Sequence, residues 1–600
     1  MSTHSARLAA LRDQLSRQQL DGFVVPLTDE HMSEYVGAYA QRLAWLTGFQ
    51  GSAGTAVVLP AEAAIFTDGR YTLQVREQVS GDDWQFVGVP ETSVSTWLAG
   101  HAKQGARIGY DPWLHTRAWV DEAGKALAAI NATLVAVDTN PVDAVWPDQP
   151  ARSDAQLSVH DDANAGRSSA EKRAAVADWL AEQQADAVVL ASLESIAWLL
   201  NVRGGDVSRT PVALAYAVVN ADGTADLYVS PEKMTDAVAQ HLGNAVRVHD
   251  RHAFGAALGR FAGKRVAVDP ALSVAAIPLA IEAGGGEVVA MRDPTVIPRA
   301  TKNAVERAGH RAASIRDGAA LSRFLRWISI EAPKGGQTEL SAAAKLEEFR
   351  RETGVLKDLS FDAISATGPH GAIPHYHVTE ESSLPIEPGQ LYLIDSGGQY
   401  VDGTTDVTRV VPIGTPTAEM RDRFTRVLKG HIALATAVFP HGTTGAQLDA
   451  LARLPLWQAG LDFAHGTGHG VGSYLSVHEG PARIAKPSYP GSGPSEPLLP
   501  GMILSNEPGY YKAGEYGIRI ENLLLVEERD IAGGESTMLA FETLTLAPID
   551  RDLIDPALMT PAELGWLNDY HARVAETLAP VLEGDDRVWL IERCAPIVAA

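Results

Sequence analysis

An internal repeat organises the first half of this chain. Residues 18–26 read QQLDGFVVP, and residues 183–191 read QQADAVVLA. A second shared element follows in each copy, LAWLTGFQGS at 43–52 and IAWLLNVRGG at 196–205, and the spacing is 12 residues longer in the first copy. Apolar residues at helical spacing precede each copy, and strand-like apolar runs follow it. This order predicts a duplicated α/β domain with one loop insertion in the first copy.

The repeat also sets the expected domain organisation. A chain of 600 residues is too long for one hydrophobic core, because single cores stop growing near about 250–300 residues. A polar stretch at 147–173 looks like a surface linker between the copies, and a long helical pattern at 304–331 follows the second copy. Almost all His, Asp and Glu in suggestive spacings lie after residue 360. We therefore expect α/β domain I at 1–150, a related α/β domain II at 151–300, and a third, chemistry-bearing domain at 301–600.

Charge and composition exclude several classes of partner. The net charge is −24 and the sequence contains no Lys/Arg cluster, which argues against a nucleic-acid partner. No stretch reaches the roughly 18 apolar residues that a membrane span requires. The single cysteine, Cys594, excludes an internal disulfide and a thiolate metal site. The N-terminal residues lack the apolar core of a signal peptide, so we expect a cytoplasmic protein.

Two aspartates follow a strand-and-turn pattern at 391–411, LYLIDSGGQYVDGTTDVTRVV. The apolar run before Asp395 is strand-like, and Asp402-Gly403 is a hairpin-turn signal. A return strand at 404–411 would place Asp395 and Asp406 on adjacent strands near one end of a sheet. Two carboxylates so close repel each other unless a cation neutralises them. The alternative interpretation is a polar hairpin with two solvated aspartates.

Three histidines lie within the segment 465–480, HGTGHGVGSYLSVHEG. The glycines around His465 and His469 argue against a helix, and therefore against the helical two-His zinc motif. Glycine-dense backbone at a His-bearing strand suggests close approach of a ligand or metal. Together with His478, these histidines are hard to explain as core packing.

Two glutamates follow in strand-like surroundings. Glu507 comes after the run GMILSN, and Glu521 lies in the apolar pattern YGIRIENLLLVEE. Apolar neighbours on both faces predict that Glu521 is buried, and a buried glutamate must be paired or metal-bound. Because side chains alternate along a strand, Arg519 would share a face with Glu521. A simple ion pair between these two residues is the alternative.

The residues combine into one donor set of four carboxylates and one imidazole: Asp395, Asp406, His469, Glu507 and Glu521. An oxygen-rich set suits Mn²⁺ or a similar divalent ion better than a structural zinc. Four carboxylates carry four negative charges, which two divalent cations balance and one does not. The residues alone therefore favour a two-metal hydrolase.

The same segments resemble a known family. LIDSGGQYVDGTTDVTR, HGTGHGVGSYLSVHEGP, NEPGYY and GIRIEN are similar to the C-terminal catalytic domain of Xaa-Pro aminopeptidases (aminopeptidase P), which are pita-bread metallopeptidases. The likeness extends to SATGPHGAIPHYH, to SEYVGAYAQRLAWLTGFQGSAGTAVV and TDGRYTLQ, and to WLNDYHARV near the C-terminus. It covers nearly the whole chain and matches the long, three-domain form of the family. It implies two related creatinase/prolidase-type α/β domains followed by a pita-bread catalytic domain.

The resemblance also implies roles for single residues. Asp395 and Asp406 would bind one metal, His469 and Glu507 the second, and Asp406 and Glu521 would bridge the two. A hydroxide held between the metals would attack the bond between an N-terminal residue and a penultimate proline. Glu507 would carry a proton to the prolyl nitrogen. The remaining histidines implied to act on the substrate are His375, His465 and His478.

Cofactors, partners and alternatives follow from the same resemblance. Two divalent ions are expected, Mn²⁺ before Zn²⁺ or Co²⁺, together with peptide substrates and a homodimer. Prolidase shares the metal ligands but accepts mainly dipeptides. Metal-free proteins on this fold, such as creatinase-like enzymes and binding proteins, form a further alternative, although all five ligand positions are filled here.

Overall fold

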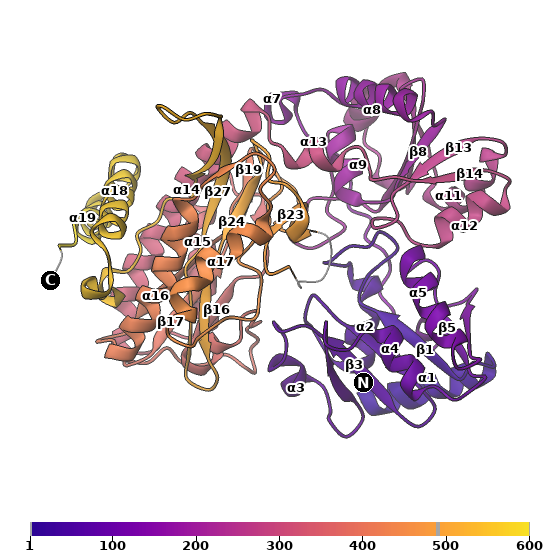
Figure 1. Cartoon of the computed structure of the whole chain (residues 1–600), viewed down its shortest axis with the longest axis horizontal. Coiled ribbons are helices and arrows are strands. Elements are labelled where there is room, and N and C mark those ends of the chain that lie inside the picture. Colours follow the sequence, from indigo (N-terminus) through magenta and orange to yellow (C-terminus); the bar gives the residue numbers. More distant parts are fainter. Residues whose placement is uncertain (1–2, 488–492, 599–600) are drawn as a thin grey trace. The chain divides into compact units, whose positions relative to one another are not determined.

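The computed structural model describes residues 3–487 and 493–598. The chain forms two compact units, Met1–Val296 and Ile297–Ala600. Figure 1 shows the secondary-structure elements of each unit. The boundaries predicted at residues 150 and 300 stay predictions.

The first unit contains two six-stranded sheets. The first sheet is formed, in spatial order, by β4 (Gln85–Gly88), β3 (Ala63–Thr67), β2 (Thr55–Val58), β1 (Gly22–Pro26), β5 (Arg107–Tyr110) and β6 (Thr133–Ala136). The second is formed by β12 (Val246–His249), β11 (Ala225–Val229), β10 (Ala215–Asn220), β8 (Ala187–Leu190), β13 (Arg265–Val268) and β14 (Glu287–Ala290). The central strands β1 and β8 are buried along their whole length, as expected for strands covered on both faces.

The two sheets share one topology, which confirms the predicted duplication. β1 pairs antiparallel with β2 and parallel with β5, and β8 pairs in the same senses with β10 and β13. A helix precedes each central strand, α1 (His4–Arg17) or α8 (Ser169–Gln183), and another follows it, α2 (Arg42–Thr47) or α9 (Leu193–Leu200). The extra residues of the first copy lie between β1 and α2, where the sequence predicts the loop insertion.

The segment 147–173 is not simply a surface linker. Its last residues begin α8, where Ser168 and Glu171 form a reciprocal capping box. Earlier, β7 (Ser158–Val159) pairs with β9 (Val202–Arg203). The polar composition that suggests a linker therefore partly reflects a helix cap, because Ser and Glu at these positions satisfy free backbone N–H groups.

The second unit is built from two main sheets. One consists of β16 (Ile364–Thr367), β17 (Leu391–Ser396) and β20 (Val407–Pro412). The other consists, in order, of β21 (Val438–Pro440), β28 (Met538–Thr543), β27 (Asn522–Arg529), β24 (Ile503–Asn506), β22 (Gly468–Gly470) and β23 (Glu479–Ile484). Small ladders complete the unit: β15 (Asp358–Leu359), β18 (Gly398–Tyr400) and β19 (Gly403–Thr404), and the pair β25 (Gly509–Lys512) and β26 (Tyr516–Arg519).

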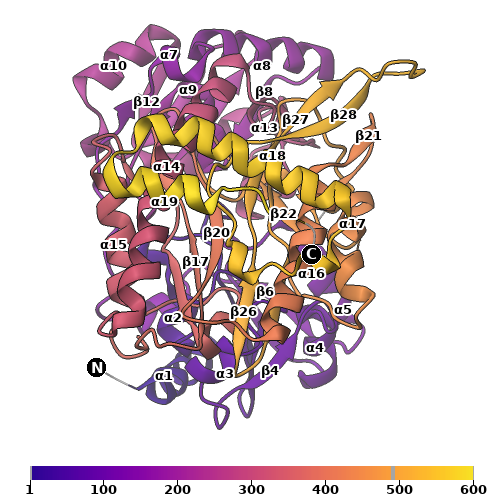
Figure 2. The ribbon, with the colours of Figure 1, turned by 90° about the vertical axis from the view of Figure 1, so that its left-hand side faces the viewer.

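Helices cover these sheets in pairs. α14 (Ala304–Glu331) packs on α15 (Glu339–Arg351), and α16 (Ala418–Ala435) packs on α17 (Gly445–Trp457). Figure 2 shows α18 (Pro561–Leu578) and α19 (Gly584–Arg593) crossing in front of the strands of this unit. The bounds of α14 match the helical pattern at 304–331. Asn303 begins α14 as an N-cap that accepts hydrogen bonds from Val305 N and Glu306 N.

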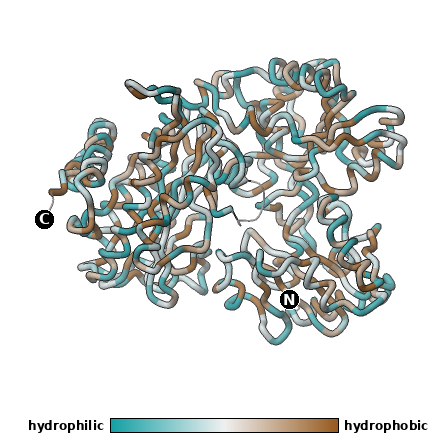
Figure 3. The backbone as a smooth tube through the Cα atoms, viewed as in Figure 1, coloured by the Kyte–Doolittle hydropathy of each residue, from teal (hydrophilic) through white to brown (hydrophobic). Residues whose placement is uncertain are grey.

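Hydrophobic side chains fill the space between these layers. Figure 3 shows brown, hydrophobic stretches of backbone inside both units and teal stretches along many outer loops. In the second unit, strands β17 and β26 and helices α16 and α18 share one core cluster. Among the residues that the structure describes, no helix combines the length and apolar character that crossing a bilayer requires.

A close backbone contact fixes one loop of the second unit. Gly371, in the short 3₁₀ helix η7 (Gly368–Ala372), lies against Gly517 of β26. A Cβ atom on Gly517 would lie 1.6 Å from the Gly371 carbonyl oxygen. Only glycine fits there, because the obstructing atom belongs to the backbone and cannot rotate away.

We expect Gly517→Ala to destabilise the second unit by about 3 kcal/mol, at the upper end for overpacked sites. Differential scanning calorimetry would show this as a lower unfolding temperature. The matched control is Gly565→Ala on α18, where no described atom other than the helix's own adjoining backbone and Gly565's chain neighbours lies within 4 Å of the new Cβ. This control should be neutral or stabilising by about 0.5–1 kcal/mol, because alanine favours a helix over glycine. Equal unfolding temperatures for the two variants would contradict the proposed contact.

Candidate metal centre

Asp395 and Asp406 are brought together by two antiparallel strands. Asp395 lies on β17 opposite Thr408 of β20, and Asp406 directly precedes β20. The predicted return strand is interrupted, because β18 and β19 form a small hairpin of their own, turning at Val401 and Asp402. Both aspartates are buried. The interpretation as two solvated aspartates on a polar hairpin is therefore wrong.

His469 lies on β22, between two glycines. A Cβ atom on Gly468 would lie 2.0 Å from Ser505 O, and one on Gly470 would lie 2.2 Å from Glu479 O. The glycines thus admit neighbouring strands, rather than the close ligand approach that the sequence suggested. The Nδ1 atom of His469 lies 3.0 Å from Gly470 O. Because a carbonyl oxygen only accepts hydrogen bonds, Nδ1 carries the proton and Nε2 carries the lone pair of the ring.

The two glutamates lie where strands end. Glu507 directly follows β24, and its backbone N–H donates to Thr467 O at 2.8 Å. Glu521 lies in the break between β26 and β27, and the Thr408 hydroxyl donates to its Oε2 at 2.6 Å. Glu521 is 1% exposed, which confirms its predicted burial. Leaving the strands lets both side chains turn toward His469.

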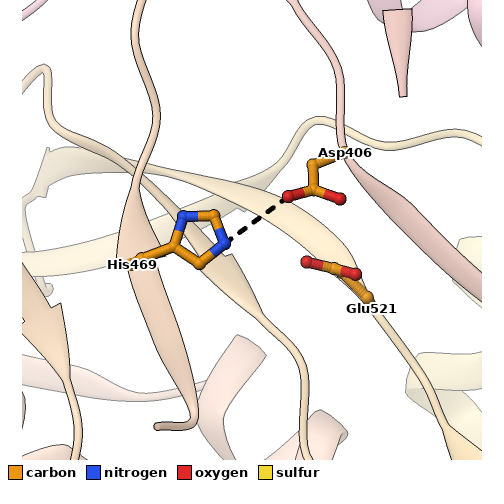
Figure 4. Close-up of side chains that lie close together, drawn as sticks. All are labelled: Asp406, His469 and Glu521. Atoms are coloured by element: carbon orange, nitrogen blue, oxygen red, sulfur yellow. Dashed lines mark ion pairs between the residues drawn. The ribbon is translucent and has the colours of Figure 1, made fainter. Parts of the chain in front are cut away.

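Asp406, His469 and Glu521 converge on one point. Each offers a ligand atom within 4.8 Å of the other two, and Figure 4 shows the three side chains turned toward one another. The Nε2 atom of His469 lies 3.5 Å from Asp406 Oδ2 and 3.5 Å from Glu507 Oε1. The predicted donors therefore meet although they come from strands of two different sheets.

The pKa values of these carboxyl groups indicate that the site needs positive charge. Burial, and then the charge of Asp395, raise the pKa of Asp406 well above its ordinary value. Burial, and then the charge of Asp406, do the same to the pKa of Glu521. Burial raises the pKa of Glu507 to about 8. These carboxylates resist ionising together unless positive charge is supplied.

Two carboxylate oxygen atoms are positioned to bind a positively charged ion. The Oδ1 atoms of Asp395 and Asp406 are buried and accept no hydrogen bond from the residues that the structure describes. Buried polar atoms are almost always satisfied, so two carboxylate oxygens without a hydrogen-bond donor among the described residues need an explanation. A donor set of this kind fits divalent metal ions.

The partner of Arg519 excludes the alternative ion pair with Glu521. The fully buried guanidinium donates to Asp395 Oδ2 at 2.6 Å, so it does not form the simple pair with Glu521 considered above. It also donates to Tyr511 OH at 2.8 Å, and this hydroxyl lies 2.8 Å from His465 Nε2. Strand alternation could place Arg519 on the site face but could not choose its partner. The role of Tyr511 had no sequence signal.

Of the three other predicted histidines, two lie beside residues of the centre. The Nδ1 atom of His465 lies 3.9 Å from Glu507 Oε2. The ring of His478 meets that of His469 edge-on, with centroids 4.3 Å apart. His375 lies half-buried on the loop after η7, the helix that packs on β26. An imidazole can donate or accept a proton near neutral pH, so these groups suit acid–base work beside a cation site.

Family models match almost the whole chain. The description "Metallopeptidase family M24" covers residues 308–528, and "C-terminal region of peptidase_M24" covers residues 537–597. The description "Creatinase/Prolidase N-terminal domain" matches twice, at 7–144 and at 148–306. The double match agrees with the repeat and with the paired sheets of the first unit.

Full-length relatives agree with these models. The chain is 41% identical to a protein of Aspergillus fumigatus named Probable Xaa-Pro aminopeptidase P, with 98% of this chain and 92% of that protein covered. The corresponding Aspergillus flavus protein is 40% identical, with coverage of 99% and 93%. Among solved structures, X-prolyl aminopeptidase from Caenorhabditis elegans, described as a cytosolic enzyme with a di-nuclear active site, matches with a TM-score of 0.94, 35% identity and full coverage of both chains. The chain belongs to metallopeptidase family M24, in its Xaa-Pro aminopeptidase P branch.

Proposed function

We propose that this enzyme removes the N-terminal residue from peptides whose second residue is proline. Similarity along the full length to the Aspergillus fumigatus and Caenorhabditis elegans aminopeptidases supports this specificity. The observation on this chain that carries the proposal is the buried convergence of Asp406, His469 and Glu521. A dedicated peptidase for this bond makes chemical sense, because an Xaa-Pro amide has no N–H and its ring restricts the backbone.

We propose that Asp395 and Asp406 hold one divalent cation, and that His469 and Glu507 hold a second. Asp406 and Glu521 would contact both. The oxygen-rich donor set favours Mn²⁺, with Zn²⁺ and Co²⁺ as alternatives. When bound, such a pair of ions supplies a water nucleophile of lowered pKa and polarises the substrate carbonyl.

The chain's own groups would do the remaining work. Glu507 would carry the proton to the prolyl nitrogen. His478 and His375 would donate to the carbonyl oxygen as negative charge develops on it. His465 would orient the substrate, since Tyr511 and the buried Arg519 fix its Nε2 side.

Asp406→Asn should abolish peptidase activity. The variant keeps the size of the side chain but removes a charge that both cations need. We expect kcat/KM to fall by at least about a thousandfold, since a ligand to catalytic metal is worth several kcal/mol of transition-state stabilisation. A metal-dependent assay on an Xaa-Pro-Xaa peptide measures the loss.

The matched control for this experiment is Asp402→Asn, the same chemical change on the same hairpin. Asp402 pairs with Arg316 instead of facing the metal centre. This control should retain activity after reconstitution with Mn²⁺. Full activity in Asp406→Asn would refute the proposed centre, and a chain that takes up no Mn²⁺, Zn²⁺ or Co²⁺ would revive the metal-free alternative.

Substrate length separates aminopeptidase from prolidase activity. An aminopeptidase tolerates chain beyond the proline, whereas a prolidase recognises the free carboxylate of a dipeptide. We expect the tripeptide Arg-Pro-Pro to be cleaved with a higher kcat/KM than the dipeptide Arg-Pro. Product release from both peptides can be followed by liquid chromatography. Cleavage of the dipeptide alone would overturn the proposed specificity.

We propose a cytoplasmic homodimer as the working form. The Caenorhabditis elegans relative is described as cytosolic. Two large apolar side chains one helical turn apart on α17, Leu454 and Trp457, are 49% and 43% exposed. Exposed apolar groups of this size favour burial against another surface, and a second copy of the chain would supply one.

A further inference from the structure

One sequence motif, on α18, lies outside the metal centre. WLNDYHARV, at 566–574, lies on α18 within the region matched by the C-terminal family model. Its Trp566 and Tyr570 rings stack in parallel, with centroids 5.3 Å apart. Both rings reach buried polar groups that lead to the metal centre.

The first connection runs from Tyr570 through Arg409. The Nη2 atom of Arg409 donates to Tyr570 OH at 3.0 Å. Its Nη1 atom donates to Glu521 O at 2.7 Å and to Thr408 O at 2.9 Å. The Arg409 guanidinium thus connects α18 to the backbone of Glu521 and to Thr408. The hydroxyl of Thr408 in turn donates to the Glu521 carboxylate.

The second connection runs from Trp566 through His431. The two rings meet edge-on, with centroids 6.1 Å apart. The Nδ1 atom of His431 lies 3.1 Å from Asn506 O and therefore carries the proton, because the carbonyl only accepts. Its Nε2 atom then accepts from Asn522 Nδ2 at 3.1 Å. His431 therefore hydrogen-bonds with Asn506, which precedes Glu507, and with Asn522, which follows Glu521.

A further hydrogen bond joins the two connections. Arg409 Nη2 donates to Asn522 Oδ1 at 2.8 Å, which completes the orientation of that amide. Burial lowers the pKa of His431 to about 3, so its ring stays neutral and keeps the same donor and acceptor. Arg409, His431, Asn522 and Tyr570 are buried, and Trp566 is partly buried. A buried network whose donors and acceptors match in this way holds its members rigidly.

We propose that Trp566 and Tyr570 of α18 form a brace that positions Glu507 and Glu521 for metal binding. Tyr570 and Trp566 act as positioning residues through Arg409 and His431, and neither touches the metal or the substrate. The inference rests on the metal-binding part of the proposed function. It gives the C-terminal region a specific task beyond covering the core.

The test compares two variants of the same motif. Tyr570→Phe removes one hydroxyl and keeps the ring that stacks on Trp566. Asn568→Ala is the matched control, because Asn568 exchanges hydrogen bonds with Ile597 instead of with the network. Both variants remove polar contacts from α18, but only the first interrupts the connection to Glu521.

Isothermal titration of the metal-free full-length chain with Mn²⁺ provides the readout. We expect Tyr570→Phe to bind Mn²⁺ about tenfold more weakly than the unaltered chain, the lower end of the range for residues that orient metal ligands. Asn568→Ala should bind as the unaltered chain does. Hydrogen exchange, followed by mass spectrometry on the metal-free proteins, should be faster in peptides containing Glu507 and Glu521 for Tyr570→Phe alone.

Unchanged Mn²⁺ affinity and unchanged exchange in Tyr570→Phe would overturn the brace. Equal losses in both variants would also overturn it, because they would reflect general loosening of α18. Neither readout uses peptide cleavage, so a chain that binds Mn²⁺ but cleaves no Xaa-Pro peptide would sink the proposed activity and leave the brace intact. The exchange measurement needs no metal and therefore tests the brace even if Mn²⁺ is the wrong ion.

Discussion

The gathering of four carboxylates beside one imidazole, in a largely buried site, is the constraint on which the catalytic unit depends. Asp395, Asp406, Glu507 and Glu521 come from different strands, and their mutual repulsion in a poorly hydrated interior must be balanced. Arg519 supplies one positive charge, through its contact with Asp395. The Oδ1 atoms of the two aspartates accept no hydrogen bond from the described residues and leave room for more positive charge. Divalent cations would complete the balance and would give the unit its chemistry.

The fold brings these groups together by interrupting its strands at the ligands. Asp406 lies between β19 and β20, and Glu521 lies between β26 and β27. At such breaks the backbone is no longer held by a regular ladder, so other contacts must fix it. These contacts are hydrogen bonds from Arg409 to Glu521 O, between His431 and Asn506 O, and from Thr408 to the Glu521 carboxylate. The repulsion among these carboxylates lowers the stability of the unit. The hydrogen-bonded network of Arg409, His431 and Thr408 offsets this loss.

Sequence reasoning reached the donor set but not its supports. The repeat predicted two sheets of one topology, and spacing within glycine-rich and apolar segments pointed to the three side chains that converge, Asp406, His469 and Glu521. It could not choose the partner of Arg519, and it gave the wrong cause for the glycines beside His469, since both depend on which strands become neighbours. Arg409 and His431 escaped notice, because a lone buried cation or histidine carries no local pattern. A single sequence does not show which distant strands become neighbours.

Anomalous diffraction at the manganese edge, from crystals grown with Mn²⁺, tests the central claim most directly. The account predicts two anomalous peaks in each chain, one beside Asp395 and the other beside His469 and Glu507, with Asp406 and Glu521 touching both. A single peak would contradict the two-metal centre. An absence of any peak at these residues, in crystals that carry the metal elsewhere, would contradict the site altogether.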